Sequence, residues 1–131
     1  MQTPTPGSNS LSGHCVLIVE DEYFLAEDLV DACRRLGAEI EGPFNNLQEA
    51  LDTLSNHEIS GAVLDVNLKN ERTFPLAHAL REREIPFVFT TGYDRSFIAA
   101  EFQDVPLWGK PFDIGAMTNE LVDLILKSQK I

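Results

Sequence analysis

The sequence predicts an α/β fold, in which a doubly wound parallel sheet of five strands carries helices on both faces. Three observations support this class. Short apolar runs alternate with segments of helical periodicity five times along the chain, the strongest runs end in acidic or hydroxyl residues, and 131 residues with 44% hydrophobic content suit one domain with a real core. Parallel strands need right-handed crossover connections, and ligands then bind beyond the carboxyl ends of the strands.

The first half of the chain predicts two strands and two helices. The run CVLIV (15–19) is apolar and stops at carboxylates, so we expect a strand buried on both faces. A helix over residues 22–36 follows, because its apolar residues recur every three or four positions, and Gly37 is placed to end it. Residues 38–44 predict a weaker, edge-like strand. Residues 46–56 predict a second helix, which its first residue, an asparagine, can cap.

The middle of the chain repeats the pattern. The run GAVLDV (61–66) predicts a second strongly apolar strand, and a polar loop over 67–73 leads to a helix over 74–83. Pro86 then opens another apolar strand, which ends in two threonines and a glycine.

The last third predicts a short helix, a short strand and a long helix. The short helix covers DRSFIAAEFQ (94–103), the strand covers VPLW (105–108), and the final helix covers 113–129. The chain ends soon after that helix, so we expect one domain over residues 14–131 and no output domain.

Composition narrows the choice of partners. A formal net charge of −11, from 21 acidic and 10 basic residues, argues against broad contact with nucleic acid phosphates or an anionic membrane, and favours a cation or a basic protein patch. No apolar run is long enough to cross a bilayer, and the polar, turn-rich residues 1–13 lack the features of a signal peptide. We therefore expect a disordered tail on a cytoplasmic protein.

The cysteines and histidines are interpreted as structural. Cys15 and Cys33 lie in apolar periodic segments, where small core residues are expected. The three histidines lack partners at ligand spacing, so we expect them to be structural or solvated; they are His14, His57 and His78.

Three carboxylates follow the predicted strands. Glu20 and Asp21 come after the first strand, and Asp65 lies at the end of the third. Brought together, they would repel one another and raise one another's pKa unless a positive charge lay among them. A few protein carboxylates with hard oxygen ligands favour Mg²⁺, with Mn²⁺ as the alternative. The sequence therefore predicts a divalent cation site.

Asp65 stands alone directly after an apolar run, which suits a nucleophile held by the sheet. A carboxylate can attack phosphorus to form an acyl phosphate, and phosphoryl transfer needs charge neutralisation and positioning. Lys110, after the fifth strand, could pair with a phosphoryl oxygen, and Thr91, at the end of the fourth, could donate a hydrogen bond.

The motifs LIVEDE, LDVNL, TTG and KPF, at these intervals along five strand–helix units, resemble those of response-regulator receiver domains of two-component signalling over residues 14–128. The resemblance implies a flavodoxin-like sheet of strand order 2-1-3-4-5 and a signalling domain that is not an enzyme. It also implies a Mg²⁺-dependent phosphoacceptor that receives its phosphoryl group from a histidine kinase or a histidine phosphotransfer protein.

Carried over by position, the resemblance implies specific roles. Asp65 is the phosphorylated aspartate, and Glu20 and Asp21 are the acidic metal-binding pair. Asn67 completes the metal shell through its backbone carbonyl. Thr91 and Lys110 match the switch hydroxyl and the lysine of the family, and the Lys110–Pro111 peptide bond is usually cis in such domains.

The stretch PFVFTTGY (86–93) resembles the PFxFATGY signature of FATGUY receivers, with Thr90 where alanine is usual. This subclass implies a histidine kinase of the HWE or a related type as phosphodonor. Gly92 is interpreted as leaving space for the phosphoryl group, and Tyr93 as tuning phosphate lifetime by restricting hydrolytic water.

The chain departs from the common receiver at Leu107. Many receivers have an aromatic residue there, three positions before the lysine, whose rotamer follows the threonine. A leucine has no ring to swing, which fits the FATGUY subclass. Trp108 is interpreted as a packing residue. We expect the short helix over 94–103 to be mobile and to change order on phosphorylation.

Other functions stay open at this stage. A receiver could act as an adaptor, a shuttle or a phosphate sink, and its downstream partner is unknown. A phosphate-independent binding module with the same fold is a second class, although packing would not require the complete set of polar residues. A hydrolase of the haloacid dehalogenase type is a third, but Asn67 stands where that class has a second aspartate.

Overall fold

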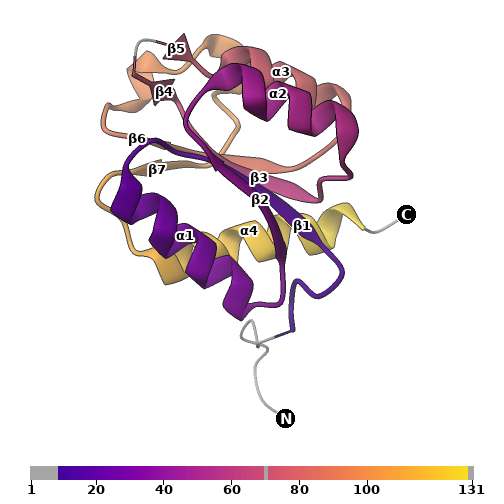
Figure 1. Cartoon of the computed structure of the whole chain (residues 1–131). Helices are drawn as coiled ribbons and strands as arrows, with labels where there is room; N and C mark the ends of the chain where they lie inside the picture. Colours follow the sequence, from indigo (N-terminus) through magenta and orange to yellow (C-terminus); the bar gives the residue numbers. More distant parts are fainter. Residues whose placement is uncertain (1–8, 70, 130–131) are drawn as a thin grey trace.

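The computed structural model describes residues 9–69 and 71–129 and has a central sheet between two layers of helices (Figure 1). All five strands of this sheet run parallel, in the order β2-β1-β3-β6-β7. The strands are β1 (Cys15–Val19), β2 (Glu39–Phe44), β3 (Gly61–Asp65), β6 (Phe87–Thr91) and β7 (Leu107–Gly109). Counted along the chain, they are the five predicted strands in the order 2-1-3-4-5, which confirms the predicted fold class.

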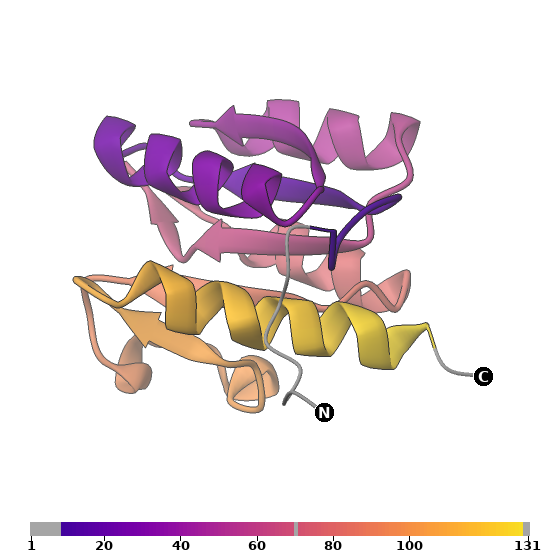
Figure 2. The ribbon, with the colours of Figure 1, turned by 90° about the horizontal axis from the view of Figure 1, so that it is seen from below.

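Among the described residues, four α-helices cover the two faces of the sheet. Helices α2 (Leu47–Asn56) and α3 (Phe74–Glu82) lie on one face, and α1 (Tyr23–Arg35) and α4 (Ile114–Ser128) lie on the other (Figure 1). Figure 2 shows α1 and α4 side by side along the same face. The predicted helices over 22–36, 46–56, 74–83 and 113–129 therefore all form, each within two residues of its expected ends.

Alternation along the strands creates a hydrophobic core on each face, because successive side chains of a strand point to opposite sides. Val63 of β3 and Val88 of β6 pack toward α1 and α4, whereas their neighbours Leu64 and Phe89 pack toward α2 and α3. Strands buried on both faces must be apolar throughout, which explains the continuous apolar runs of the sequence.

The helix ends follow local sequence signals. Asn46 caps α2 by accepting a hydrogen bond from the main-chain N–H of Glu49 at 2.9 Å, and its own amide donates to the Glu49 carboxylate at 2.8 Å. Gly37 follows α1 with φ of +94°, a conformation that glycine adopts without the steric cost paid by other residues.

Residues 67–73 differ from the predicted polar loop. They contain two short antiparallel strands, β4 (Asn67–Leu68) and β5 (Glu71–Arg72). Leu68 is buried in the core on the α2 and α3 side and anchors this otherwise polar stretch to the domain.

The predicted short helix over 94–103 does not form. Two 3₁₀ turns, η1 (Arg95–Phe97) and η2 (Ala100–Phe102), occupy the segment instead. Arginine side chains donate hydrogen bonds to main-chain oxygens of this segment: Arg81 donates to Glu101 O at 2.7 Å and Arg95 to Gln103 O at 2.8 Å. Phe102 is fully buried, and its ring lies 5.6 Å from that of Phe74. Tertiary contacts thus outweigh the local helical pattern.

The amino-terminal end of the domain starts earlier than predicted. Residues 1–8 of the predicted tail lie outside the described residues, but residues 9–13 form turns, and Leu11 is fully buried between α1 and α4. Its main-chain N–H donates to Leu36 O at 2.7 Å. Within the described residues, every helix is too short or too polar to cross a membrane.

Candidate functional site

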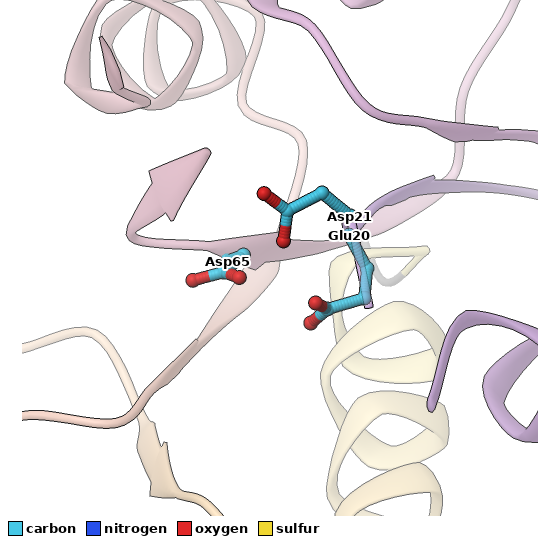
Figure 3. Close-up of side chains that lie close together, drawn as sticks. All are labelled: Glu20, Asp21 and Asp65. Carbon is cyan, nitrogen blue, oxygen red and sulfur yellow. The ribbon is translucent and has the colours of Figure 1, made fainter. Parts of the chain in front are cut away.

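Three carboxylates meet where the sheet ends. Glu20 and Asp21 follow β1, and Asp65 is the last residue of the neighbouring strand β3. Figure 3 shows their side chains facing a common space, and one oxygen from each can be chosen such that all lie within 4.8 Å of one another. Parallel strands place their carboxyl ends at one edge, so the three acids predicted from the sequence come together there.

A main-chain N–H fixes each of these carboxylates. The Glu22 N–H donates to Glu20 Oε2 at 2.9 Å, and the Asn67 N–H donates to Asp65 Oδ1 at 3.1 Å. The Lys69 N–H donates to Asp21 Oδ2 at 3.1 Å. The acids are therefore held in place by the backbone of the loops that follow β1 and β3.

Lys110 supplies the positive charge of the site. Its Nζ lies 3.0 Å from Asp65 Oδ2, 3.1 Å from both oxygens of Glu20 and 2.9 Å from Glu22 Oε2. The main-chain N–H of Lys110 donates to Thr91 O at 2.7 Å, and the Lys110–Pro111 peptide bond is cis, as the family resemblance implied. The peptide bond before Pro111 thus has the isomer that the resemblance implied.

Burial and charge together set the protonation of the site. Glu20 is only 2% exposed, and this burial raises its pKa to about 7, although Lys110 opposes the rise. Burial likewise raises the pKa of Asp65, again against the effect of Lys110. For Lys110 itself, burial lowers the pKa, but its carboxylate partners together raise the pKa by a larger amount. The pKa of Lys110 therefore lies above its usual value.

The carboxylates have the chemistry expected of a divalent cation site. Glu20 Oε1 is buried and accepts no hydrogen bond from any described residue, although Lys110 Nζ is near. A buried oxygen that accepts no hydrogen bond is costly, and a divalent cation bound to it would offset that cost. Oxygen ligands of this kind suit Mg²⁺ or Mn²⁺.

An open pocket of about 510 Å³ lies over the acids. Residues from four strand ends line it, namely Asp21, Glu22, Asp65, Asn67, Lys69, Thr91, Gly92, Tyr93 and Lys110. Thr91 Oγ1 accepts a hydrogen bond from the Tyr93 N–H at 2.9 Å, which leaves the hydroxyl proton available to a ligand. A Cβ at Gly92 would meet no atom within 4 Å, so this side of the pocket is open.

The remaining sequence-predicted residues take different places. Tyr93 is 54% exposed, with its ring 4.9 Å from that of Phe97. Leu107 packs, half-buried, against the core on the α2 and α3 side. Trp108 packs on the opposite side, where its Nε1 donates to Glu120 Oε1 of α4 at 2.7 Å.

Sequence reasoning missed Glu22. The run EDE (20–22) follows the first strand, but only its first two acids were predicted to be site residues. The third, Glu22, accepts a hydrogen bond from Lys110, which lies 88 positions further along the chain. The third carboxylate in the run was the available signal. Thr73 was also missed; its hydroxyl donates to the main-chain oxygen of Asp65 at 2.6 Å and supports the strand end. The three histidines lie outside the acidic cluster, as expected.

Comparison with known proteins shows which proteins the chain is similar to. No protein-family model matches the chain. The solution structure of SdrG from Sphingomonas melonis Fr1 is 32% identical, with a TM-score of 0.68, over 89% of this chain and 98% of that one. A second structure of SdrG, in a BeF₃-activated conformation, is 36% identical over 84% of this chain and 95% of that one, also with a TM-score of 0.68.

Two further proteins are similar to the chain at lower sequence identity. A response regulator receiver protein from Sinorhizobium medicae has the same fold, with 20% identity and a TM-score of 0.76 over 88% of this chain and 97% of that one. The transcriptional regulatory protein PdtaR of Mycobacterium tuberculosis is 27% identical over 118 residues, which cover 87% of this chain and 58% of that protein. The chain spans about half the length of the curated relatives it matches.

Proposed function

The chain belongs to the response-regulator receiver family, and we propose that Asp65 accepts a phosphoryl group from a phosphohistidine in a Mg²⁺-dependent reaction. One observation carries the proposal: Asp65 Oδ2 lies 3.0 Å from the ammonium group of Lys110, inside the only cluster of three acidic ligands among the described residues. A nucleophile, a cationic partner and a metal-binding acid pair are thus in one pocket.

The proposed step is a displacement at phosphorus. A carboxylate oxygen of Asp65 forms an O–P bond while the P–N bond to the donor histidine breaks. The electron pair of that bond returns to the imidazole nitrogen, which takes a proton from solvent. Asp65 becomes an acyl phosphate, and the donor is released as neutral histidine.

The chain's own residues would orient and neutralise the phosphoryl group. Lys110 Nζ would donate to one of its oxygens and the Thr91 hydroxyl to another. Glu20, Asp21, Asp65 and the backbone carbonyl of Asn67 would hold Mg²⁺ or Mn²⁺. When bound, the metal supplies positive charge that offsets both the acids and the phosphoryl oxygens.

The motif PFVFTTGY supports assignment to the FATGUY subclass and a kinase of the HWE or a related type as donor. A histidine phosphotransfer protein is the alternative donor. We propose a signalling role, in which the surface altered by phosphorylation contacts another protein, and a cytoplasmic location, rather than catalysis of a substrate's turnover. Tyr93 borders the pocket, where its ring would limit access of water to the acyl phosphate.

The mass of the intact protein after incubation with Mg²⁺ and phosphoramidate tests this function. A single added phosphoryl group, absent from Asp65→Asn, is the expected result. Steady release of phosphate without a phosphorylated protein would instead identify a hydrolase. An unmodified protein would identify a phosphate-independent binding module.

A further inference from the structure

The ammonium group of Lys110 has no free donor in this structure. An ammonium carries three N–H donors, and the three are taken by Glu20, Asp65 and Glu22. While Asp65 is still a carboxylate, an oxygen of the incoming phosphoryl group can therefore reach Nζ only if one of these carboxylates gives up its hydrogen bond.

The three carboxylates differ in what their release would cost. The side chain of Glu20 is fully buried and that of Asp65 is 7% exposed, so release of either from Lys110 would leave a desolvated acid that has lost the cationic partner it has in this structure. The side chain of Glu22 is 59% exposed, and water can solvate it as soon as it leaves. Glu22 is the partner that can be exchanged at least cost.

The position of Glu22 in the chain also fits an exchangeable contact. Glu22 is the N-cap residue of α1, but its side chain caps none of the helix N–H groups. It extends over the sheet edge to Lys110 instead, and it stands outside the cluster of Glu20, Asp21 and Asp65. The carboxylate therefore serves neither the helix nor the metal ligands.

We propose that Glu22 is a positioning residue that occupies Lys110 before phosphorylation and competes with the incoming phosphoryl group for it. This inference rests on the proposed function of Asp65. In the unphosphorylated state, Glu22 holds one N–H of Lys110. On phosphoryl transfer, the Glu22 carboxylate turns to solvent and a phosphoryl oxygen accepts that hydrogen bond. Glu22 thereby restrains acceptance of the phosphoryl group.

Titration with beryllofluoride, a phosphoryl analogue, tests the proposal at constant Mg²⁺, with amide NMR shifts as the readout. Exposed ion pairs are worth little, so we expect Glu22→Gln to bind the analogue about two- to fivefold tighter than wild type. Glu27→Gln removes the same charge from the exposed surface of α1 and should stay near wild type. Equal or weaker binding by Glu22→Gln than by Glu27→Gln would overturn the proposal.

A second variant separates the contact from the charge. Glu22→Asp keeps the charge but shortens the side chain, so it should lose the contact with Lys110 and approach Glu22→Gln in affinity. Wild-type affinity of Glu22→Asp beside tight binding by Glu22→Gln would contradict the contact and leave only long-range repulsion. Failure of the wild type to bind beryllofluoride or accept phosphate would instead refute the function of Asp65.

Discussion

Lys110 Nζ lies 3.0 Å from Asp65 Oδ2, although 45 positions separate the two residues in the chain. The contact forms because β3 and β6 pair in register, β7 pairs with β6, and the strands deliver both residues to one edge of the sheet. It joins the proposed phosphoacceptor to a cation, and several measurable properties of the protein depend on it.

Lys110→Ala should destabilise the protein at neutral pH in the absence of divalent metal. The substitution removes the partner of two buried carboxylates, which should lower the free energy of unfolding by about 1–3 kcal/mol. Lys127→Ala is the matched control, because Lys127 pairs with Asp123 on the surface of α4 and should change stability by at most about 0.5 kcal/mol. Urea denaturation measures both, and equal effects of the two variants would count against a structural ion pair at Lys110.

The stability of the metal-free protein should fall as the pH rises from about 4.5 to about 7. Glu20 keeps its proton in the folded state up to its raised pKa of about 7 but releases it near its usual value of 4.5 when unfolded. The folded state therefore binds more protons in this window, and folding weakens with rising pH. Urea denaturation in chelator should show a shallower fall for Glu20→Gln than for wild type. The same pH dependence in both proteins would refute the shifted pKa.

The segment from η1 to η2 should lose order when Arg81 is removed. Arg81 donates to Glu101 O, pairs with Asp104 at 3.1 Å and lies 5.1 Å from the centre of the Phe102 ring. Arg81→Ala should lower stability by about 1 kcal/mol and speed amide exchange in residues 95–104. Arg34→Ala, at the end of α1, is the control.

Residues 95–104 should also change their protection from amide exchange when beryllofluoride and Mg²⁺ are added. Identical protection in both states would exclude this segment as a switch.

Tyr93→Ala should shorten the lifetime of the phosphorylated protein. The exposed ring borders the pocket and contacts Phe97, so its removal opens a path for water toward Asp65. We expect dephosphorylation several-fold faster, followed as loss of the added mass over time. Tyr93→Phe keeps the ring and should behave like wild type. Equal rates for Tyr93→Ala and wild type would remove Tyr93 from the control of phosphate lifetime.

The sequence predicts most of the fold because its signals are local. Continuous apolar runs mark strands buried on both faces, and the asparagine cap at Asn46 marks the start of α2. The polar residues at strand ends could be placed together because parallel strands share one carboxyl edge. These inferences need no knowledge of how distant side chains meet.

The remaining features depend on distant contacts. Residues 94–103 have a helical pattern, but arginines and a buried Phe102 hold the segment in 3₁₀ turns. Leu11 lies in a polar stretch, and its burial depends on packing in the hydrophobic cluster that α1 and α4 form with the sheet. The partnership of Glu22 with Lys110 likewise requires the folded sheet edge.

If Asp65 is phosphorylated as proposed, the receiver would have to respond without an aromatic ring at position 107. Leu107 pairs with Phe89 in the sheet and packs, half-buried, against the core, and it has no ring to swing between buried and exposed states. The hydrogen bond from Lys110 N to Thr91 O directly links the two residues that would contact the phosphoryl group. We expect movement of either one to be transmitted to the β6 and β7 ends and to the adjoining segment 95–104.

Locating the acyl phosphate tests the central claim most directly. The protein is incubated with phosphoramidate and Mg²⁺, reduced with borohydride, which converts a phosphorylated aspartate to homoserine, and mapped by peptide mass spectrometry. The account predicts homoserine at position 65 alone, and none in a sample prepared with chelator. Homoserine at another aspartate, or none at position 65 despite Mg²⁺, would contradict it.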